Sequence, residues 1–325
     1  TRPLIMRLSF YCVLEVGIED PDEPKDPETP HFIPAYSQKV KASKEFQTFQ
    51  FDHSFVLNSL KSSMEGYVFH NQPLDTDDLL EQTVKLFNSC KTSLELFDML
   101  HNMCAYDDST YAHSLNVALI CRRIGKWLKV DAATLDTLTL CGLLHDIGKL
   151  KIPDEILNKP GKYTDEEFDL VKRHTKFGYE LLKTLNIDPH IKKAALLHHE
   201  RCDGSGYPLK ATQKDLDDFS MVVAIADVYD AMTAARSYRA PLCPFQVIER
   251  FEQEGLQKYK PKFILTFLQH IASTYQNNRV LLSNGQSANI VMLNQQHLAR
   301  PIVQLNDNSC IDLSTRLDLH IQSIL

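Results

Sequence analysis

A chain of 325 residues can form one large domain with appendages, or two domains. Its hydrophobic content of 43% and charged content of 24% are ordinary for a globular protein, and its net charge of -7 argues against binding to DNA or RNA duplexes, which requires a basic surface. No apolar run approaches the roughly 18 residues that a membrane helix needs, so we expect no membrane segment in this chain.

The eight cysteines are spread from Cys12 to Cys310 without any CxxC pair. In a chain of this length such spacing does not indicate a disulfide framework. Free thiols in a reducing compartment fit better, so we predict a cytoplasmic location. The sequence starts at Thr1 rather than at a methionine, which leaves room for an upstream sensor or anchor.

The first 106 residues contain three successive segments with different sequence patterns. Residues 4–18 alternate between apolar and other side chains, which predicts a strand, and residues 19–30 contain four prolines among acidic residues, which predicts an exposed linker. We therefore assign residues 1–45 to an N-terminal strand and linker. Residues 46–106 have mainly helical patterns and are expected to form a helical lead-in, with Thr76 and Asp77 as candidate caps of one helix.

From Thr110 to about Ser273 the pattern is helical nearly throughout. Thr164, followed by two glutamates, is typical of a helix N-cap. The predicted helices cover residues 114–128, 135–148, 165–174, 189–200 and 221–235.

In the C-terminal part of the chain, apolar residues recur with the shorter period that is typical of strands. Four β-like runs cover residues 289–293, 301–305, 311–313 and 317–321, and turn-forming residues mark Asn284-Gly285 and residues 306–309. We expect residues 280–325 to form a small β appendix, which the N-terminal strand could join. The predicted fold class is therefore mainly α, with a small β appendix.

Candidate metal ligands gather between the middle of the chain and residue 227. HDIGK covers residues 145–149, His174 stands alone, HHERCDGSGYP covers residues 198–208, and Asp227 lies in an apolar helix. Imidazole and carboxylate groups are common ligands of divalent metals, and a carboxylate beside a histidine can bridge two cations. Lys149, four residues after His145, would share its helix face and could meet a bound anion.

Each of these residues has an ordinary alternative role. A single histidine such as His113 or His174 is more often a plain core or surface residue, and Asp227 could pair with a neighbour. The pair His145-Asp146 alone is too short a motif to be informative. Only the combination at this spacing favours a metal site, because a carboxylate is costly to bury unless it is paired or bound to a metal.

The unbroken patterns HDxGK and HHExxDGxGYP resemble the HD-GYP domain, a branch of the HD metal-dependent phosphohydrolases. The resemblance covers roughly residues 107–272 and implies a catalytic domain over residues 107–275 with the fold of an HD-type helical bundle. It also implies a cyclic di-GMP phosphodiesterase with a centre of two or three metals, usually iron or manganese.

The resemblance also implies roles for individual residues. Asp146 would bridge two metals, and Lys149 would contact the scissile phosphate. Arg236 and Arg239 would contact substrate phosphate, and the loop of Gly206, Tyr207 and Pro208 would lie beside the site. The implied metal ligands are His113, His145, Asp146, His174, His198, His199 and Asp227.

The predicted reaction is hydrolysis of cyclic di-GMP to pGpG, to GMP or to both, by a hydroxide that bridges the metals. Iron or manganese is expected, with zinc, nickel or magnesium as alternatives, because these ligands suit several divalent ions. One alternative substrate is another cyclic dinucleotide, such as cyclic GMP-AMP. A non-catalytic receptor for cyclic di-GMP is a second alternative, which the complete ligand set disfavours. A homodimer, or a partner at the GYP loop or the β appendix, also remains open.

One departure from the family pattern concerns the number of metals. Some members carry a glutamate four residues before the first metal histidine, where it helps to hold a third metal, and this chain has Ser109 there. Because a neutral hydroxyl is a poor substitute for a carboxylate, we expect two tightly bound ions per chain. Elemental analysis of anaerobically prepared protein would measure this number, and three tightly bound ions would refute the expectation.

Overall fold

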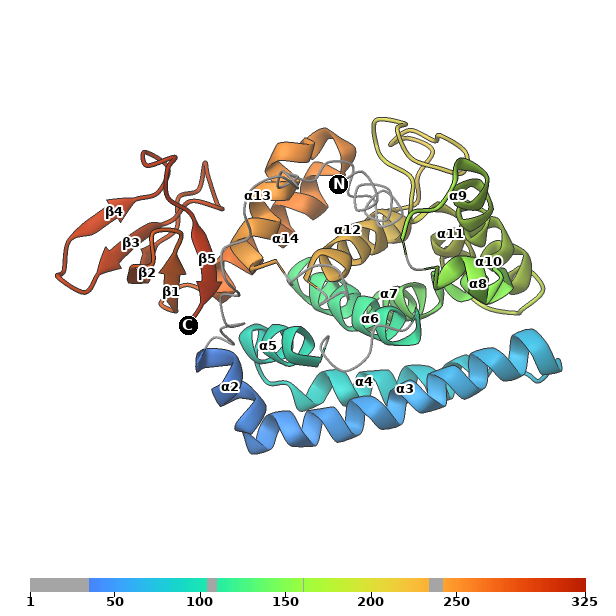
Figure 1. Cartoon of the computed structure of the whole chain (residues 1–325). Coiled ribbons are helices and arrows are strands. Elements are labelled where there is room, and N and C mark those ends of the chain that lie inside the picture. The colour runs from blue at the N-terminus through green and yellow to red at the C-terminus, as the bar shows by residue number, and fades with distance from the viewer. Residues whose placement is uncertain (1–34, 104–109, 160, 234–241) are drawn as a thin grey trace.

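The computed structural model describes residues 35–103, 110–159, 161–233 and 242–325. The strand expected at residues 4–18 and the linker at 19–30 lie outside this part of the chain. Helices make up most of the described chain, and a single five-stranded sheet follows them at the C-terminal end (Figure 1). The prediction of a mainly α fold with a small C-terminal β appendix is confirmed.

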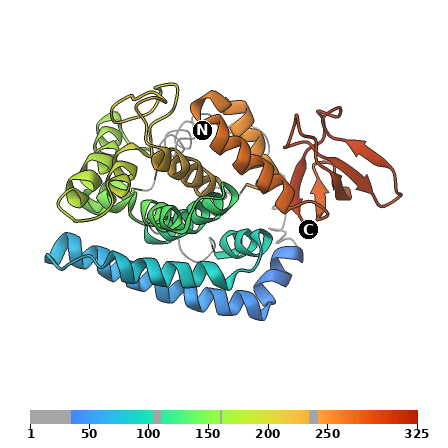
Figure 2. The ribbon, with the colours of Figure 1, turned by 180° about the vertical axis from the view of Figure 1, so that it is seen from behind.

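In the described part of the chain, four helices precede the predicted catalytic region. They are α2 (Ala35–Ala42), α3 (Lys44–His70), α4 (Thr76–Ser89) and α5 (Ser93–Met103). The long helix α3 runs along one side of the molecule with α4 beside it (Figure 2). The cap of α4 is Asp75, whose carboxylate accepts hydrogen bonds from the backbone of Asp77 and Asp78, so the predicted cap at Thr76 and Asp77 was one or two residues too late.

The central helices contain three of the seven predicted metal ligands, His113, His174 and Asp227, and the other four lie in the turns that follow helices. The central helices are α6 (Thr110–Trp127), α7 (Ala132–Leu144), the 3-10 helix η1 (Ile147–Lys151), α8 (Asp154–Leu157), α9 (Asp165–Lys172), α10 (His174–Leu182), α11 (Pro189–Leu197) and α12 (Asp218–Thr233). Thr164 caps α9 as predicted, in a capping box with Glu167.

Three predicted helix ends were wrong. The helix expected over residues 165–174 ends at Lys172, and His174 begins α10. The helix expected to continue to residue 148 ends at Leu144, so His145 and Asp146 lie in the turn that leads into η1. The helix expected to continue to residue 200 ends at Leu197, and the double histidine follows it. The error at residue 145 arises because the apolar pattern resumes at Ile147, beyond the point where the backbone turns.

The C-terminal part joins a helical pair to the sheet. Helices α13 (Pro244–Glu254) and α14 (Pro261–Thr274), with the short η2 (Leu256–Lys258) between them, precede the antiparallel strands. The strands are β1 (Arg279–Leu282), β2 (Ser287–Met292), β3 (Ile302–Leu305), β4 (Cys310–Asp312) and β5 (Ile321–Ile324), in the order β4-β3-β2-β1-β5.

The sequence reading of the sheet was partly wrong. Strand β1 was not predicted, and the run expected at 317–321 contributes only Ile321, the first residue of β5. The Arg300 side chain fastens the sheet to the helices, because it donates to the carbonyl of Leu319 at 3.1 Å and pairs with Glu249 of α13 at 2.7 Å. Buried side chains from α3 through to the sheet form one continuous hydrophobic core. Among the described residues, no helix is both long and apolar enough to cross a membrane.

The 3-10 helix η1 lies directly against α10, and a glycine makes this contact possible. A β-carbon at Gly148 would lie 1.9 Å from the carbonyl oxygen of His174 and 2.4 Å from the amide nitrogen of Gly178. Both neighbours are backbone atoms, which cannot rotate away as a flexible side chain could. The position of η1 against α10 therefore requires glycine at residue 148.

We expect Gly148→Ala to destabilise the protein by about 1–3 kcal/mol or more, because η1 and α10 must separate. Thermal unfolding of the two proteins would measure this. Gly178→Ala is the matched control on the facing helix, since its β-carbon would meet Ala195 at an acceptable 3.4 Å. Equal unfolding temperatures for wild type and Gly148→Ala would contradict the close contact.

Candidate metal centre

The carboxylate of Asp146 is the centre of a buried cluster of imidazoles. Its Oδ1 lies 3.3 Å from Nε2 of His174 and 3.6 Å from Nε2 of His198. Its Oδ2 lies 3.3 Å from Nε2 of His145 and 3.6 Å from Nε2 of His113. The two oxygens of one carboxylate thus face two different pairs of imidazoles.

This arrangement divides the donors into two groups that share Asp146. In each group the donor atoms all lie within 4.8 Å of one another, close enough to share an ion. The first group is His113, His145 and Asp146, and the second is Asp146, His174, His198 and His199. A carboxylate that belongs to both groups has the position of a bridging ligand.

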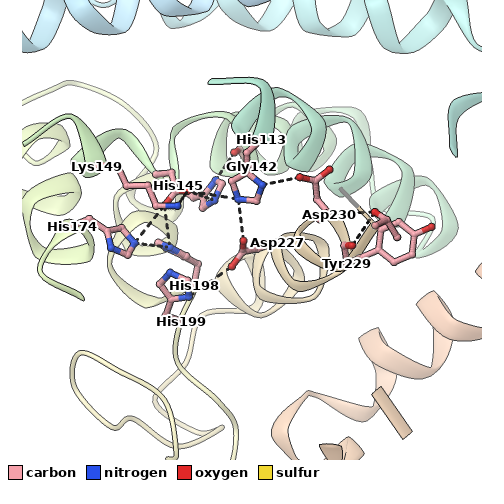
Figure 3. Close-up of polar contacts among 12 residues, drawn as sticks. His113, Gly142, His145, Lys149, His174, His198, His199, Asp227, Tyr229 and Asp230 are labelled. Carbon is pink, nitrogen blue, oxygen red and sulfur yellow. Dashed lines mark hydrogen bonds and ion pairs between the residues drawn. The ribbon is translucent and has the colours of Figure 1, made fainter. Parts of the chain in front are cut away.

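Asp227 of α12 reaches both sides of the cluster. Its Oδ1 lies 3.0 Å from Nε2 of His113, and its Oδ2 lies 3.7 Å from Nδ1 of His199 (Figure 3). Asp227 is 1% exposed. All seven residues predicted as metal ligands, from five separate helical regions, therefore meet in one buried place.

Backbone carbonyls orient three of the histidines. In each case Nδ1 contacts a carbonyl oxygen, which can only accept a hydrogen bond, so Nδ1 carries the proton and the lone pair is left on Nε2. Those Nε2 atoms are the ones that face Asp146. The bonds run from His145 to Gly142 O at 2.7 Å, from His174 to Val171 O at 2.7 Å, and from His198 to Ala194 O at 2.9 Å.

A carboxylate that the sequence reading missed orients the fourth histidine. Asp230 accepts a hydrogen bond from Nδ1 of His113 at 2.7 Å, and its side chain is buried (Figure 3). Asp230 is three residues after Asp227, so both carboxylates lie on the same face of α12. That spacing, inside an otherwise apolar helix, was the available signal for its role.

Asp146 and three of the imidazoles, those of His174, His198 and His199, have the protonation states that metal binding requires. Burial lowers the pKa of His174 to about 3 and also lowers the pKa values of His198 and His199, so these imidazoles are neutral. Burial alone would raise the pKa of Asp146, but the charge of Lys149 and the contact with His145 hold it well below its usual value. The carboxylate is therefore ionised.

The pKa of His113 shifts in the opposite direction, upward. Burial opposes its charged form, yet hydrogen bonds and Coulombic attraction from Asp227 and Asp230 raise the pKa of His113 to about 10. Two buried carboxylates on one imidazole create a strongly negative region, and a metal cation would compensate for it.

Lys149 is the cation that already contacts Asp146. It lies on η1 rather than on the same helix as His145, so the predicted shared helix face was wrong. Its ammonium lies 2.5 Å from Oδ2 of Asp146, and the residue is 4% exposed. The turn between α7 and η1 thus brings Lys149 into the same pocket as the metal donors.

The GYP loop closes one side of the cluster. The ring of Tyr207 lies 4.7 Å from that of His199. Glu200 holds the loop, because its carboxylate accepts hydrogen bonds from the backbone of Leu209 at 2.6 Å and Ala211 at 3.0 Å. A β-carbon at Gly206 would lie 2.4 Å from the α-carbon of Glu200, so only glycine fits there.

Three residues of the predicted site cannot be placed. Arg236, Arg239 and Ser109 lie outside the described residues.

The donor set fits divalent metal ions. Nε2 of His145 is buried and makes no hydrogen bond within the described parts of the chain, although it lies 3.3 Å from Asp146. Buried polar atoms are rarely left in this state unless another group completes their environment. Imidazole nitrogens and carboxylate oxygens in this proportion suit iron, manganese and zinc alike.

Comparison with known proteins agrees with this geometry. Residues 78–263 match the sequence model of a family described as HD domain. The chain is 34% identical over 183 residues to a 3'3'-cGAMP-specific phosphodiesterase of Vibrio cholerae, covering 55% of this chain and 35% of the relative. It is also 34% identical to a cyclic di-GMP phosphodiesterase of Thermotoga maritima, with 58% of this chain and 53% of the relative covered. Its identity to a cyclic di-GMP phosphodiesterase of Pseudomonas aeruginosa is again 34%, with 61% of this chain and 48% of the relative covered. The matched region thus spans about half or less of each relative.

We expect Asp230→Asn to lower metal affinity by about 10- to 100-fold, because the partner that orients His113 loses its charge. Competition with a chromophoric chelator would measure the affinity. Asp136→Asn is the control: Asp136 pairs with Arg122 at 2.8 Å on a side chain that is 42% exposed, and this change should leave metal binding intact. Unchanged affinity in Asp230→Asn would show that Asp230 has no such role.

Proposed function

Because this chain belongs to the HD domain family, we propose that it is a metal-dependent phosphodiesterase that hydrolyses cyclic di-GMP. The observation that carries the proposal is the place of Asp146, whose carboxylate belongs to two groups of metal donors and also contacts Lys149. The names of the relatives from Thermotoga maritima and Pseudomonas aeruginosa support cyclic di-GMP as the substrate.

The proposed cofactor is a pair of divalent ions, iron or manganese first. His113 and His145 would hold one ion, His174, His198 and His199 would hold the other, and Asp146 would bridge them, with Asp227 completing the set. Bound ions of this kind lower the pKa of a water molecule and neutralise charge on phosphate oxygens. The neutral state of His174 supports its role as a ligand, since an imidazole must lose its second proton to bind a metal.

Lys149 is the residue that we propose to contact the scissile phosphate. Its ammonium faces the donor cluster from η1, where it would pair with a phosphate oxygen and stabilise the negative charge that increases during hydrolysis. The GYP loop of Gly206, Tyr207 and Pro208 would form the wall beside the substrate, held in place by Glu200. Arg236 and Arg239 are proposed as further phosphate contacts on the family pattern alone.

Cyclic GMP-AMP is the second candidate substrate. A Vibrio cholerae relative named a 3'3'-cGAMP-specific phosphodiesterase matches this chain as closely in identity as the cyclic di-GMP enzymes do, at 34%. The ions held by the metal donors would act on the phosphodiester linkage, which both dinucleotides share. The bases must therefore be distinguished by residues outside the donor cluster.

We propose the cytoplasm as the location, since six described cysteines are free thiols. A homodimer or a partner could use the GYP loop, where Leu209 is 57% exposed, or the β appendix, where Met292 is 59% exposed.

The function is tested with purified protein loaded anaerobically with iron or with manganese. We expect cyclic di-GMP to be converted to pGpG, with or without further conversion to GMP, and chromatography of the products would follow both. Cyclic GMP-AMP should be assayed beside it at equal concentration. Tight binding of cyclic di-GMP without any product in metal-loaded protein would indicate a receptor instead of an enzyme.

Two lysines of η1 allow the proposed role of Lys149 to be tested against a control on the same helix. Lys149→Ala should keep its metal content and lower kcat by at least about 100-fold, since it removes a charge at the reacting phosphate. Lys151→Ala should leave kcat unchanged, because Lys151 is exposed and its ammonium contacts the carbonyl of Val68 at 3.4 Å. Loss of metal in Lys149→Ala would show that its role is structural.

A further inference from the structure

A cavity with a mainly apolar lining and a few polar groups lies away from the donor cluster. Its volume is about 180 Å³, and it lies where α2, α5, the start of α13 and strand β5 meet. Figure 1 shows α2 and α5 beside β5 at the junction of the helices and the sheet. Since a water molecule occupies roughly 30 Å³ in the liquid, the cavity has room for a small organic molecule. Its walls include Tyr36, Asp98, His101, Leu242, Pro244 and Tyr275.

Asp98 supplies a buried carboxylate that has no positive partner among the residues that the structure describes. The residue is 8% exposed, and its carboxylate accepts a hydrogen bond from the hydroxyl of Tyr36, which is neutral. Within the described ranges, no lysine, arginine or histidine forms an ion pair with it. Burial raises the pKa of Asp98 to about 7, which reflects the absence of a compensating charge. A cation would remove this penalty.

Two further polar atoms in the same walls have no hydrogen-bond partner within the described parts of the chain. The hydroxyl of Tyr275 is buried on a residue that is 1% exposed, and neither it nor Nε2 of His101 has a hydrogen-bond partner among the described residues. Buried hydroxyls are nearly always hydrogen-bonded in folded proteins. The unpaired Tyr275 hydroxyl in the cavity wall is therefore an observation independent of Asp98 that points to a missing ligand.

We propose that this cavity binds a small organic cation, with its ammonium group at Asp98 and a hydrogen bond to the Tyr275 hydroxyl. The apolar side chains of Leu242, Pro244 and Ile324 would contact the hydrocarbon part. An anionic ligand would be repelled by Asp98. A metal ion is disfavoured too, because within the described chain the groups of three or more metal donors lie only around Asp146.

The site is separate from the proposed reaction. None of its wall residues is a predicted metal ligand or a member of the GYP loop. Binding can therefore be measured on the metal-loaded chain without reference to catalysis, and a negative result here leaves the proposed phosphodiesterase untouched.

The test uses n-butylammonium chloride as the probe, with metal-loaded full chain at pH 8.5, where the Asp98 carboxyl is ionised. We expect a saturable rise in unfolding temperature, with half-saturation in the millimolar range that is roughly the limit for so small a ligand. Sodium chloride at the same ionic strength and n-butanol at the same concentration should give no such rise. An equal effect of n-butanol and n-butylammonium would overturn the proposal.

Variants separate the ligand site from general stability. Asp98→Asn can still accept the hydrogen bond from Tyr36, so it should fold, and it should lose the n-butylammonium effect. Tyr275→Phe removes an unpaired hydroxyl, so its unfolding temperature without ligand should be equal or higher, while half-saturation should shift at least fivefold upward. Asp136→Asn should respond as wild type does. A full n-butylammonium response in Asp98→Asn would refute the proposed site.

Discussion

The burial of the Asp146 charge is the constraint on which the arrangement of the helical core depends. A carboxylate that is 1% exposed is destabilising unless positive groups and hydrogen-bond donors surround it. Here the surroundings come from distant parts of the chain: Lys149 follows in the next turn, and imidazoles arrive from α6, α10 and the end of α11. The helices therefore pack around a charge as well as around apolar side chains.

Carbonyl groups at helix ends fix the orientation of three histidines in this cluster. The last turn of an α-helix leaves carbonyl groups without intrahelical partners, and polar side chains usually satisfy them. In this protein the final turns of α7, α9 and α11 supply the carbonyls of Gly142, Val171 and Ala194, which accept from histidine Nδ1 atoms. Each of these bonds sets the tautomer of a metal donor at the end of a helix, and the carbonyl of Ala194 also accepts from the backbone of His198 at 3.1 Å.

The sequence was sufficient to predict the donors because their chemistry is carried by residue type and spacing. HDIGK and HHERCDGSGYP identify imidazoles, carboxylates and a lysine whatever the local backbone does. Backbone geometry was harder to predict, because Leu143 and Leu144 continue the apolar pattern up to the turn at His145. Strand β1 was missed because its four residues directly follow a helix and a short turn, and so show too little alternation to recognise.

Asp230 and Asp98 show why residues that support a ligand histidine or line a cavity are difficult to predict from a sequence. Each lies in a helix that carries other acidic residues, and only the fold reveals that one binds His113 while the other lines a cavity. The fold also relates the two, because His101 of α5 lies in the field of Asp230 and in the cavity wall beside Asp98. A single helix, α5, thus holds both Asp98 and a histidine that is influenced by the charge of Asp230, and the sequence pattern gives no sign of this.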